Sequence, residues 1–324
     1  MQLNSWGMYP QIKSKKFTFK TKDNLKDILK ENSTFIPFGN GRSYGDSALA
    51  ENIIYSKPYN YFLDFDEKLG ILHCQSGVML SEIIEAFVPR GWFLKVTPGT
   101  KLITIGGAIA SDVHGKNHHV EGCFSSCVEE FTLILPNGEI KNVKKDDELF
   151  LATCGGMGLT GVILDAKISL KKINSKYINQ TTIKTKNLKE TFEAFEKYSH
   201  MPYSVAWIDC LASGEDIGKC LLMVGDFADD GKLDFKEKKK INIPFNFCTN
   251  KLNGWSINIT EIIGVNNSKD FAMAGGTESG NFIVIFLFTR NLKISIDIKA
   301  QTIAVKSPLA SRYLASIIGI QPEF

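Results

Sequence analysis

A glycine-rich segment near the amino terminus constrains the fold of this chain more than any other feature. A short run predicted to be a strand, residues 33–38, leads into Gly39-Asn40-Gly41-Arg42-Ser43-Tyr44-Gly45-Asp46. Glycines let the backbone turn tightly with its N–H groups directed inward, so a loop can hold a phosphate without side-chain charge. Tyr44 stands where the dinucleotide fingerprint of a Rossmann fold has its third glycine. The loop therefore predicts an anion-binding nest outside that fold, or an ordinary turn.

A second segment joins small residues to a polar cluster. Gly106 to Ser111 would let a helix or loop lie flat against a planar ligand, and Asp112 to His119 follows at once. His114 and His118 have the spacing of a zinc helix, but intervening glycine and asparagine disfavour a helix, and no carboxylate or thiol stands at ligand spacing. We therefore predict polar residues that line a site, with satisfied core histidines as the alternative and no metal.

A third segment contains the formal pattern G-x-G-x-x-G at Gly156, Gly158 and Gly161. A predicted helix precedes it and a predicted strand follows it, whereas the nicotinamide fingerprint requires strand, turn and helix in that order. The segment predicts either a turn that passes close to an adenine or ribose, or a simple glycine-rich helix cap.

Short helices and strands alternate along the chain, and the strands come in hairpins as often as in crossovers. This pattern predicts an α+β architecture rather than a doubly wound sheet, with a domain boundary near residue 172. The Asn137-Gly138 pair predicts a tight hairpin turn. The predicted helices are 24–32, 80–87, one that begins at 146, and 186–200. The predicted strands are 33–38, 61–65, 70–75, 93–96, 128–135, 140–143, 161–170, 204–209, 219–224 and 281–289.

Composition excludes some classes of protein. A net charge of +3 gives no field that would imply a nucleic-acid partner. Seven widely spaced cysteines without a Cys-x-x-Cys pair indicate reduced thiols, and Met1 to Lys20 lacks a signal-peptide core, so we expect a cytoplasmic protein. The lysine-rich run 232–240 and the apolar residues after it predict a solvated loop or, alternatively, peripheral contact with the inner face of an anionic membrane.

The order of these segments resembles the decaprenylphosphoryl-β-D-ribose 2-oxidase family, whose members have a vanillyl-alcohol oxidase (PCMH) type of FAD-binding fold. The likeness covers roughly residues 5–265. The strings that carry it are Gly41-Arg-Ser-Tyr-Gly-Asp46, Thr104-Ile-Gly-Gly-Ala-Ile-Ala110, Asp112-Val-His-Gly-Lys-Asn-His-His119, Gly156-Met-Gly-Leu-Thr-Gly161 and Tyr203-Ser-Val-Ala-Trp-Ile-Asp-Cys210.

The resemblance implies two domains. Residues 1–172 would form the PCMH-type FAD-binding domain of two α+β subdomains, and residues 173–324 an antiparallel-sheet substrate (cap) domain. From about Phe271 the sequence has no family counterpart, so we expect this second domain to be incomplete, either truncated or divergent.

The resemblance also implies the cofactor site. Some relatives in the wider fold attach the flavin to a histidine of the first loop; Arg42 occupies that place here, so FAD is expected to bind without a covalent bond. The expected FAD contacts are Pro37, Phe38, Gly39, Asn40, Gly41, Arg42, Ser43, Tyr44, Gly45, Asp46, Ser47, Gly99, Thr104, Ile105, Gly106, Gly107, Ser111, Asp112, Val113, His114 and Ile163.

The family oxidises the C2 hydroxyl of a polyprenyl-phosphate-linked ribose, in the synthesis of an arabinan precursor of cell-wall polysaccharide. A partner reductase then converts the keto sugar to the arabinose epimer. Tyr44, His114 and Lys116 match positions near the flavin face and are candidates for substrate orientation and proton transfer, or for bracing the loop only. Two alternatives stay open: a flavin oxidase of a free sugar alcohol or aldonolactone, and a non-catalytic flavin-binding remnant.

Overall fold

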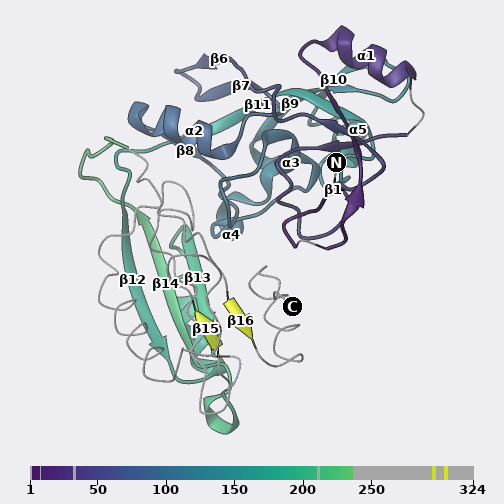
Figure 1. Ribbon diagram of the computed structural model, residues 1–324. Helices are drawn as coiled ribbons and strands as arrows, with labels where there is room; N and C mark the ends of the chain where they lie inside the picture. Colours follow the sequence, from purple (N-terminus) through teal and green to yellow (C-terminus); the bar gives the residue numbers. More distant parts are fainter. Residues whose placement is uncertain are drawn as a thin grey trace. The chain divides into compact units, whose positions relative to one another are not determined.

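The computed structural model describes residues 2–7, 9–31, 34–209 and 212–235, and the backbone of two short strands beyond them. The chain divides into two units, drawn in Figure 1. The first contains the residues up to Asn174 together with Leu233–Phe235, and the second begins at Ser175. Each unit is described by itself below.

A small parallel sheet forms the amino-terminal part of the first unit. Its strands lie in the order β3, β5, β4, and helix α1 connects the two outer strands, β3 and β4, since parallel strands of one sheet need a crossover connection. A two-stranded antiparallel sheet, β1 with β2, precedes it. The bounds are β1 (Gln2–Leu3), β2 (Ile12–Lys13), β3 (Lys15–Thr18), α1 (Lys22–Glu31), β4 (Ile36–Phe38) and β5 (Asn52–Tyr55).

A larger antiparallel sheet forms the rest of the first unit. Its strands lie in the order β10, β9, β11, β7, β6, and the short strand β8 pairs with the carboxyl-terminal end of β11. The strands are β6 (Phe62–Asp66), β7 (Ile71–Gln75), β8 (Trp92–Leu94), β9 (Val128–Ile134), β10 (Ile140–Lys144) and β11 (Val162–Lys172). Gly138 has φ of 84° in the turn between β9 and β10, the left-handed conformation predicted for this hairpin.

Short helices follow the strands of the larger sheet. Helix α2 is amphipathic and continues into the 3-10 turn η1, which ends at Gly91, whose φ of 79° is accessible to glycine without strain. The helices are α2 (Leu80–Phe87), η1 (Val88–Arg90), α3 (Ile105–Ala110), α4 (His118–Glu121), η2 (Phe124–Cys127) and α5 (Glu148–Thr153).

A hydrophobic cluster joins the two sheets of the first unit. Helix α1 contributes Leu25, strand β5 contributes Ile54, and the larger sheet contributes Ile134 and Leu164. These side chains are fully buried, and burying one aliphatic side chain stabilises the fold by about 1.5–3 kcal/mol. The cluster therefore fixes the small sheet, and with it the loop that leaves β4, against the larger sheet.

The second unit is a three-stranded antiparallel sheet with one helix packed on it. The strand order is β12, β14, β13, and Ala194 of α6 packs against Leu222 and Val224 of β14. Its elements are β12 (Ile178–Thr185), α6 (Leu188–Lys197), β13 (Tyr203–Ile208), η3 (Gly214–Asp216) and β14 (Cys220–Phe227), with β15 (Ile294–Ile296) and β16 (Ile303–Val305) further along the chain.

The predicted α+β architecture is confirmed, and so is the hairpin around residues 137–138. Strands β3, β5 and β12 were not predicted. The cysteines of the described residues are free: Cys74, Cys123, Cys127, Cys154 and Cys220. The predicted strand 281–289, most of the lysine-rich run 232–240, and the segment after Phe271, apart from the backbone of β15 and β16, lie outside the described residues.

Candidate functional site

The first glycine-rich loop begins where β4 ends and lies against the second segment. Gly41 has φ of 64°, which glycine adopts at no steric cost. A Cβ added to Gly39 would collide with the hydroxyl of Thr104, so the backbone of the loop touches that side chain directly. Asn40 Nδ2 donates a hydrogen bond of 2.7 Å to the carbonyl oxygen of Leu102. Both contacts tie the loop to the start of α3.

The outer part of the loop is open to solvent. Tyr44 is 58% exposed, and its ring meets the edge of Trp6 with the centroids 5.5 Å apart. The backbone N–H of Trp6 donates to the carbonyl oxygen of Ser43 over 3.1 Å. Sequence reasoning missed Trp6, because nothing in the pattern links it to a loop so far along the chain. The exposed residues are Arg42, Tyr44, Gly45, Asp46 and Ser47.

Helix α3 carries the small residues of the second segment. Thr104 caps it, since its Oγ1 accepts a hydrogen bond of 3.2 Å from the backbone N–H of Gly107. The N–H of Gly106 donates to the carbonyl oxygen of Ser76 over 2.8 Å, and an added Cβ would lie 3.1 Å from Ser76 Cβ. Glycine therefore allows α3 to lie directly on the chain that leaves β7.

The polar cluster after α3 is held by its own side chains. Asp112 has φ of 39°, and its Oδ1 and Oδ2 accept from the N–H and hydroxyl of Ser125 over 2.7 and 3.1 Å. Asn117 is fully buried and donates from Nδ2 to the carbonyl oxygen of Lys95 over 2.6 Å. A Cβ on Gly115 would collide with the carbonyl oxygen of Thr97. The cluster is therefore a braced loop around a short helical turn, α4.

The third segment docks on both of the others. The N–H groups of Gly155 and Met157 donate to the carbonyl oxygens of Ile109 and Ala110, at the end of α3, over 3.1 and 2.8 Å. A Cβ added to Gly158, which has φ of 81°, would lie 3.3 Å from Pro37 Cδ, at the start of the first loop. The structure thus brings together three glycine-rich segments that are far apart in the sequence.

Two glycines of this group are not required by the protein itself. At Gly45 and Gly99 the backbone has no left-handed conformation, and an added Cβ would meet no atom of the described residues within 4 Å. Open space beside bare backbone is what a closely bound ligand needs. Two buried oxygens, Ser76 Oγ beside Gly106 and Asn117 Oδ1 within the second segment, also have no hydrogen-bond partner in the part of the chain that the structure describes. The residues present therefore fit a ligand that lies against the backbone and accepts or donates hydrogen bonds.

The predicted contact residues do not all have side chains available to a ligand. Phe38, Ile105 and Ile163 are buried in the core, the last of them opposite Leu133 in the larger sheet. We therefore expect only their main-chain atoms to approach a ligand. Sequence reasoning missed Ser76, although the Gly77 beside it is a signal of close backbone approach.

The three catalytic candidates differ in environment. His114 is exposed and forms a backbone bridge with Cys123. Lys116 is half-buried, and burial lowers the pKa of its ammonium group to about 8. Tyr44 lies on the outer part of the first loop, against Trp6. Lys116 is thus the candidate whose amine is partly unprotonated near neutral pH.

The rings of the histidines of the second segment meet edge to face. The ring centroids of His114 and His118 are 5.7 Å apart, and those of His118 and His119 are 5.9 Å apart. Within the described ranges, no group of three His, Cys, Asp or Glu residues has the geometry to hold a metal ion.

In the part of the chain that the structure describes, no helix is long and apolar enough to span a membrane.

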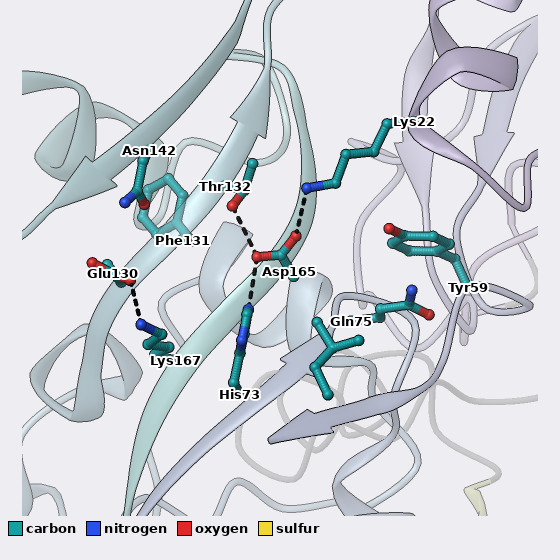
Figure 2. A pocket seen from close by; sticks show the side chains of 11 residues that line it. Lys22, Tyr59, His73, Gln75, Glu130, Phe131, Thr132, Asn142, Asp165 and Lys167 are labelled. Atoms are coloured by element: carbon teal, nitrogen blue, oxygen red, sulfur yellow. Dashed lines mark hydrogen bonds and ion pairs between the residues drawn. The ribbon is translucent and has the colours of Figure 1, made fainter. Parts of the chain in front are cut away.

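A separate cavity of about 410 Å³ opens on the larger sheet (Figure 2). Asp165 lies at its centre. Its Oδ1 is 2.9 Å from His73 Nε2 and accepts a hydrogen bond of 2.8 Å from Thr132 Oγ1. Lys22 of α1 approaches Asp165 Oδ2 at 3.5 Å. Beside these four residues, Lys167 Nζ pairs with Glu130 Oε1 at 2.9 Å.

The charges of this cavity satisfy one another, and none of the residues predicted to contact FAD lines it. Lys22 comes from the helix of the small sheet, whereas Asp165 comes from the larger sheet. We therefore interpret the cluster as a polar joint between the two sheets. The lining residues are Lys22, Tyr59, Leu63, His73, Gln75, Glu130, Phe131, Thr132, Asn142, Asp165 and Lys167.

Comparison with protein families decides the class of ligand. Residues 17–144 match the model of a family described as "FAD binding domain". The chain carries an FAD-binding domain. The match contains the first loop and the second segment, so the predicted FAD-binding fold is confirmed and the cofactor is FAD. The individual contact residues remain predictions.

Three named proteins show which enzymes the chain is similar to. It is 35% identical over 208 residues to decaprenylphosphoryl-beta-D-ribose oxidase of Mycolicibacterium smegmatis, over 62% of this chain and 45% of that protein. It is 30% identical over 144 residues to Delta(24)-sterol reductase of Pisum sativum, over 43% and 25%. It is 27% identical over 129 residues to L-gulonolactone oxidase 3 of Arabidopsis thaliana, over 37% and 22%.

The similarity is therefore to two oxidases and a reductase whose names give different substrates. The aligned regions span less than half the length of each of these relatives. Similarity of this extent supports the FAD-binding part most strongly, because that is the part the family match covers.

Proposed function

We propose that this chain is an FAD-dependent oxidoreductase that oxidises a sugar hydroxyl, at C2 of a polyprenyl-phosphate-linked ribose, to the 2-keto sugar. The observation that carries the proposal is the convergence of three glycine-rich segments around α3, in a chain 35% identical over 208 residues to decaprenylphosphoryl-beta-D-ribose oxidase. The reaction would be the first half of an epimerisation to arabinose.

The three segments would hold FAD by main-chain contact. The N–H groups of the first loop would bind the diphosphate, and the open faces of Gly45 and Gly99 leave room for the cofactor against bare backbone. Arg42 at the position of a flavin-linking histidine supports non-covalent binding, because a guanidinium group does not form that bond. FAD, when bound, supplies the hydride-accepting chemistry.

The side chains of the second segment would orient the substrate and accept its proton. Oxidation of a carbinol releases the hydroxyl proton, and a base works best when its pKa lies near the operating pH. The lowered pKa of Lys116, about 8, makes its amine suited to this role. His114 and Tyr44 are exposed and available to hydrogen-bond a sugar.

A second candidate keeps the cofactor and changes the substrate. The similarity to L-gulonolactone oxidase 3 favours a free aldonolactone, or a sugar alcohol, as the alternative. We favour the lipid-linked pentose because that relative is matched over more of the chain and at higher identity.

The proposal implies partners and a location. The product keto sugar would pass to a separate reductase, and a lipid-linked substrate would bring the protein to the inner face of the membrane from the cytoplasm. The lysine-rich run 232–240 has the charge that attracts a protein to anionic lipids.

The test is anaerobic reduction of the FAD-loaded protein by candidate substrates, measured as the loss of the flavin absorption band. We expect bleaching by a polyprenyl-phosphoryl ribose but not by xylitol or gulonolactone. The reverse pattern would select the alternative substrate class. Bound FAD that none of the three compounds reduces would contradict both enzymatic proposals and support a flavin-binding protein without this activity.

A further inference from the structure

Lys57 is linked to the first glycine-rich loop although it lies outside that loop in the sequence. It follows strand β5, and its Nζ donates a hydrogen bond of 2.9 Å to Asn40 Oδ1. The amide nitrogen of Asn40, Nδ2, in turn donates a hydrogen bond of 2.7 Å to the carbonyl oxygen of Leu102. One lysine therefore orients the asparagine that ties the first loop to the second segment.

The backbone around Lys57 is fixed. The N–H of Ser56 donates to the carbonyl oxygen of Phe38, the last residue of β4, over 3.0 Å. A Cβ added to Gly77 would collide with the carbonyl oxygens of Ser56 and Tyr59, on either side of Lys57 and Pro58. The ammonium group is thus presented to the loop from a rigid turn.

The charge of Lys57 has no acidic partner in the part of the chain that the structure describes, where Asn40 Oδ1 is its hydrogen-bond acceptor. The side chain is half-buried. A positive charge beside the loop without an acidic neighbour favours an anion close by. The neighbouring loop is the segment whose glycines predict an anion-binding nest.

We propose that Lys57 positions Asn40 and supplies positive charge to the diphosphate of FAD at the first loop. The inference rests on FAD binding and is independent of the sugar that the protein oxidises. An ammonium group near a phosphate strengthens binding, and the effect weakens as salt screens the charge. Removal of the charge should therefore lower FAD affinity and also flatten its salt dependence.

The test compares three substitutions by titrating the apoprotein with FAD and following flavin fluorescence at low and high NaCl. Lys57→Arg keeps the charge, Lys57→Gln can keep the hydrogen bond to Asn40 without the charge, and Lys57→Met keeps neither. We expect Kd within about twofold of wild type for the arginine variant and about tenfold weaker binding for the other two, with a flatter salt dependence. Lys68→Met, at an exposed site, is the control.

Three outcomes would overturn the proposal. Glutamine and methionine variants with the affinity and salt dependence of the wild type would remove Lys57 from the site. If the glutamine variant binds FAD like the wild type and the methionine variant binds it more weakly, Lys57 acts only as a structural contact. Failure of the wild type to bind FAD would remove the site itself, whereas FAD binding without sugar oxidation would count only against the proposed function.

Discussion

At the scale of single residues, the glycines of the site fall into two kinds. Gly39 is required by the fold, because a Cβ there would collide with Thr104. Gly99 is not, because its surroundings are open. A sequence pattern shows both only as glycine, whereas the structure separates the glycines that pack the protein from those that leave room for a ligand.

This difference predicts opposite effects of two alanine substitutions. Gly39→Ala should lower the free energy of unfolding by about 1–3 kcal/mol, since overpacking displaces the loop or the cap of α3. Gly99→Ala should leave the unfolding of the apoprotein unchanged and weaken FAD binding about tenfold. Thermal unfolding without FAD and fluorescence titration with FAD measure the two quantities. A Gly99→Ala variant with wild-type FAD affinity would show that FAD does not lie against the open face of Gly99.

Lys116 gives a prediction about pH. Its pKa is lowered to about 8 from the ordinary 10.5 by burial, so between these values the folded protein binds fewer protons than the unfolded chain. The contribution of Lys116 to stability therefore rises with pH through that window. Pulse labelling of amines, read by mass spectrometry, should give Lys116 a reactivity midpoint near pH 8, with the exposed Lys68 as control. A midpoint equal to that of Lys68 would contradict the assignment.

At the scale of elements, the structure shows what brings the segments together. Helix α3 lies on the chain after β7, its end accepts the third segment, and its cap touches the first loop. The sheets that carry these segments are joined by a hydrophobic cluster and by the ion pairs around Asp165. The position of the site therefore depends on the joint between the two sheets.

The polar joint between the two sheets predicts that a substitution of Asp165 lowers the stability of the protein. Asp165 is buried, and its carboxylate contacts Lys22, His73 and Thr132. Asp165→Asn should lower the free energy of unfolding by about 1–3 kcal/mol, because Lys22 loses its oppositely charged partner in this cluster. Denaturant unfolding measures it, with the exposed Asp64→Asn as control. An unfolding curve like that of the wild type would show that the cluster does not hold the sheets.

Sequence reasoning predicted the elements with a strong local pattern and missed those defined by partners. The apolar run before Gly39 and the Asn137-Gly138 turn were sufficient to place β4 and the hairpin. Strand β5 is four residues long and is stabilised by parallel neighbours on both sides, which no local pattern shows. The sequence left α3 open between helix and loop, because its two glycines disfavour a helix that the contact with Ser76 stabilises.

The same distinction applies to the site. The three segments were recognised from their glycines, but their convergence depends on carbonyl groups of α3 and on Pro37 and Thr104, whose roles are tertiary. Lys57 and Trp6 act through contacts with the first loop that have no sequence signature. The glycine patterns therefore indicated the main-chain segments of the candidate site and did not indicate the side chains that support them.

At the scale of the whole molecule, we infer that three separated glycine-rich segments form a single site for FAD. The family match covers residues 17–144 and does not reach the third segment, whose place rests on hydrogen bonds to α3. If the segments act as one site, a change in the third should weaken a cofactor that the first two also hold.

Titration of the purified protein with FAD tests this claim most directly, comparing the wild type with Gly158→Ala. We predict one FAD per chain, released on acid precipitation because no covalent bond holds it. Gly158→Ala should bind at least about tenfold more weakly, since φ of 81° and the contact with Pro37 both make a side chain at this position strained. A wild type that takes up no FAD after reconstitution, or a variant with unchanged affinity, would contradict the claim.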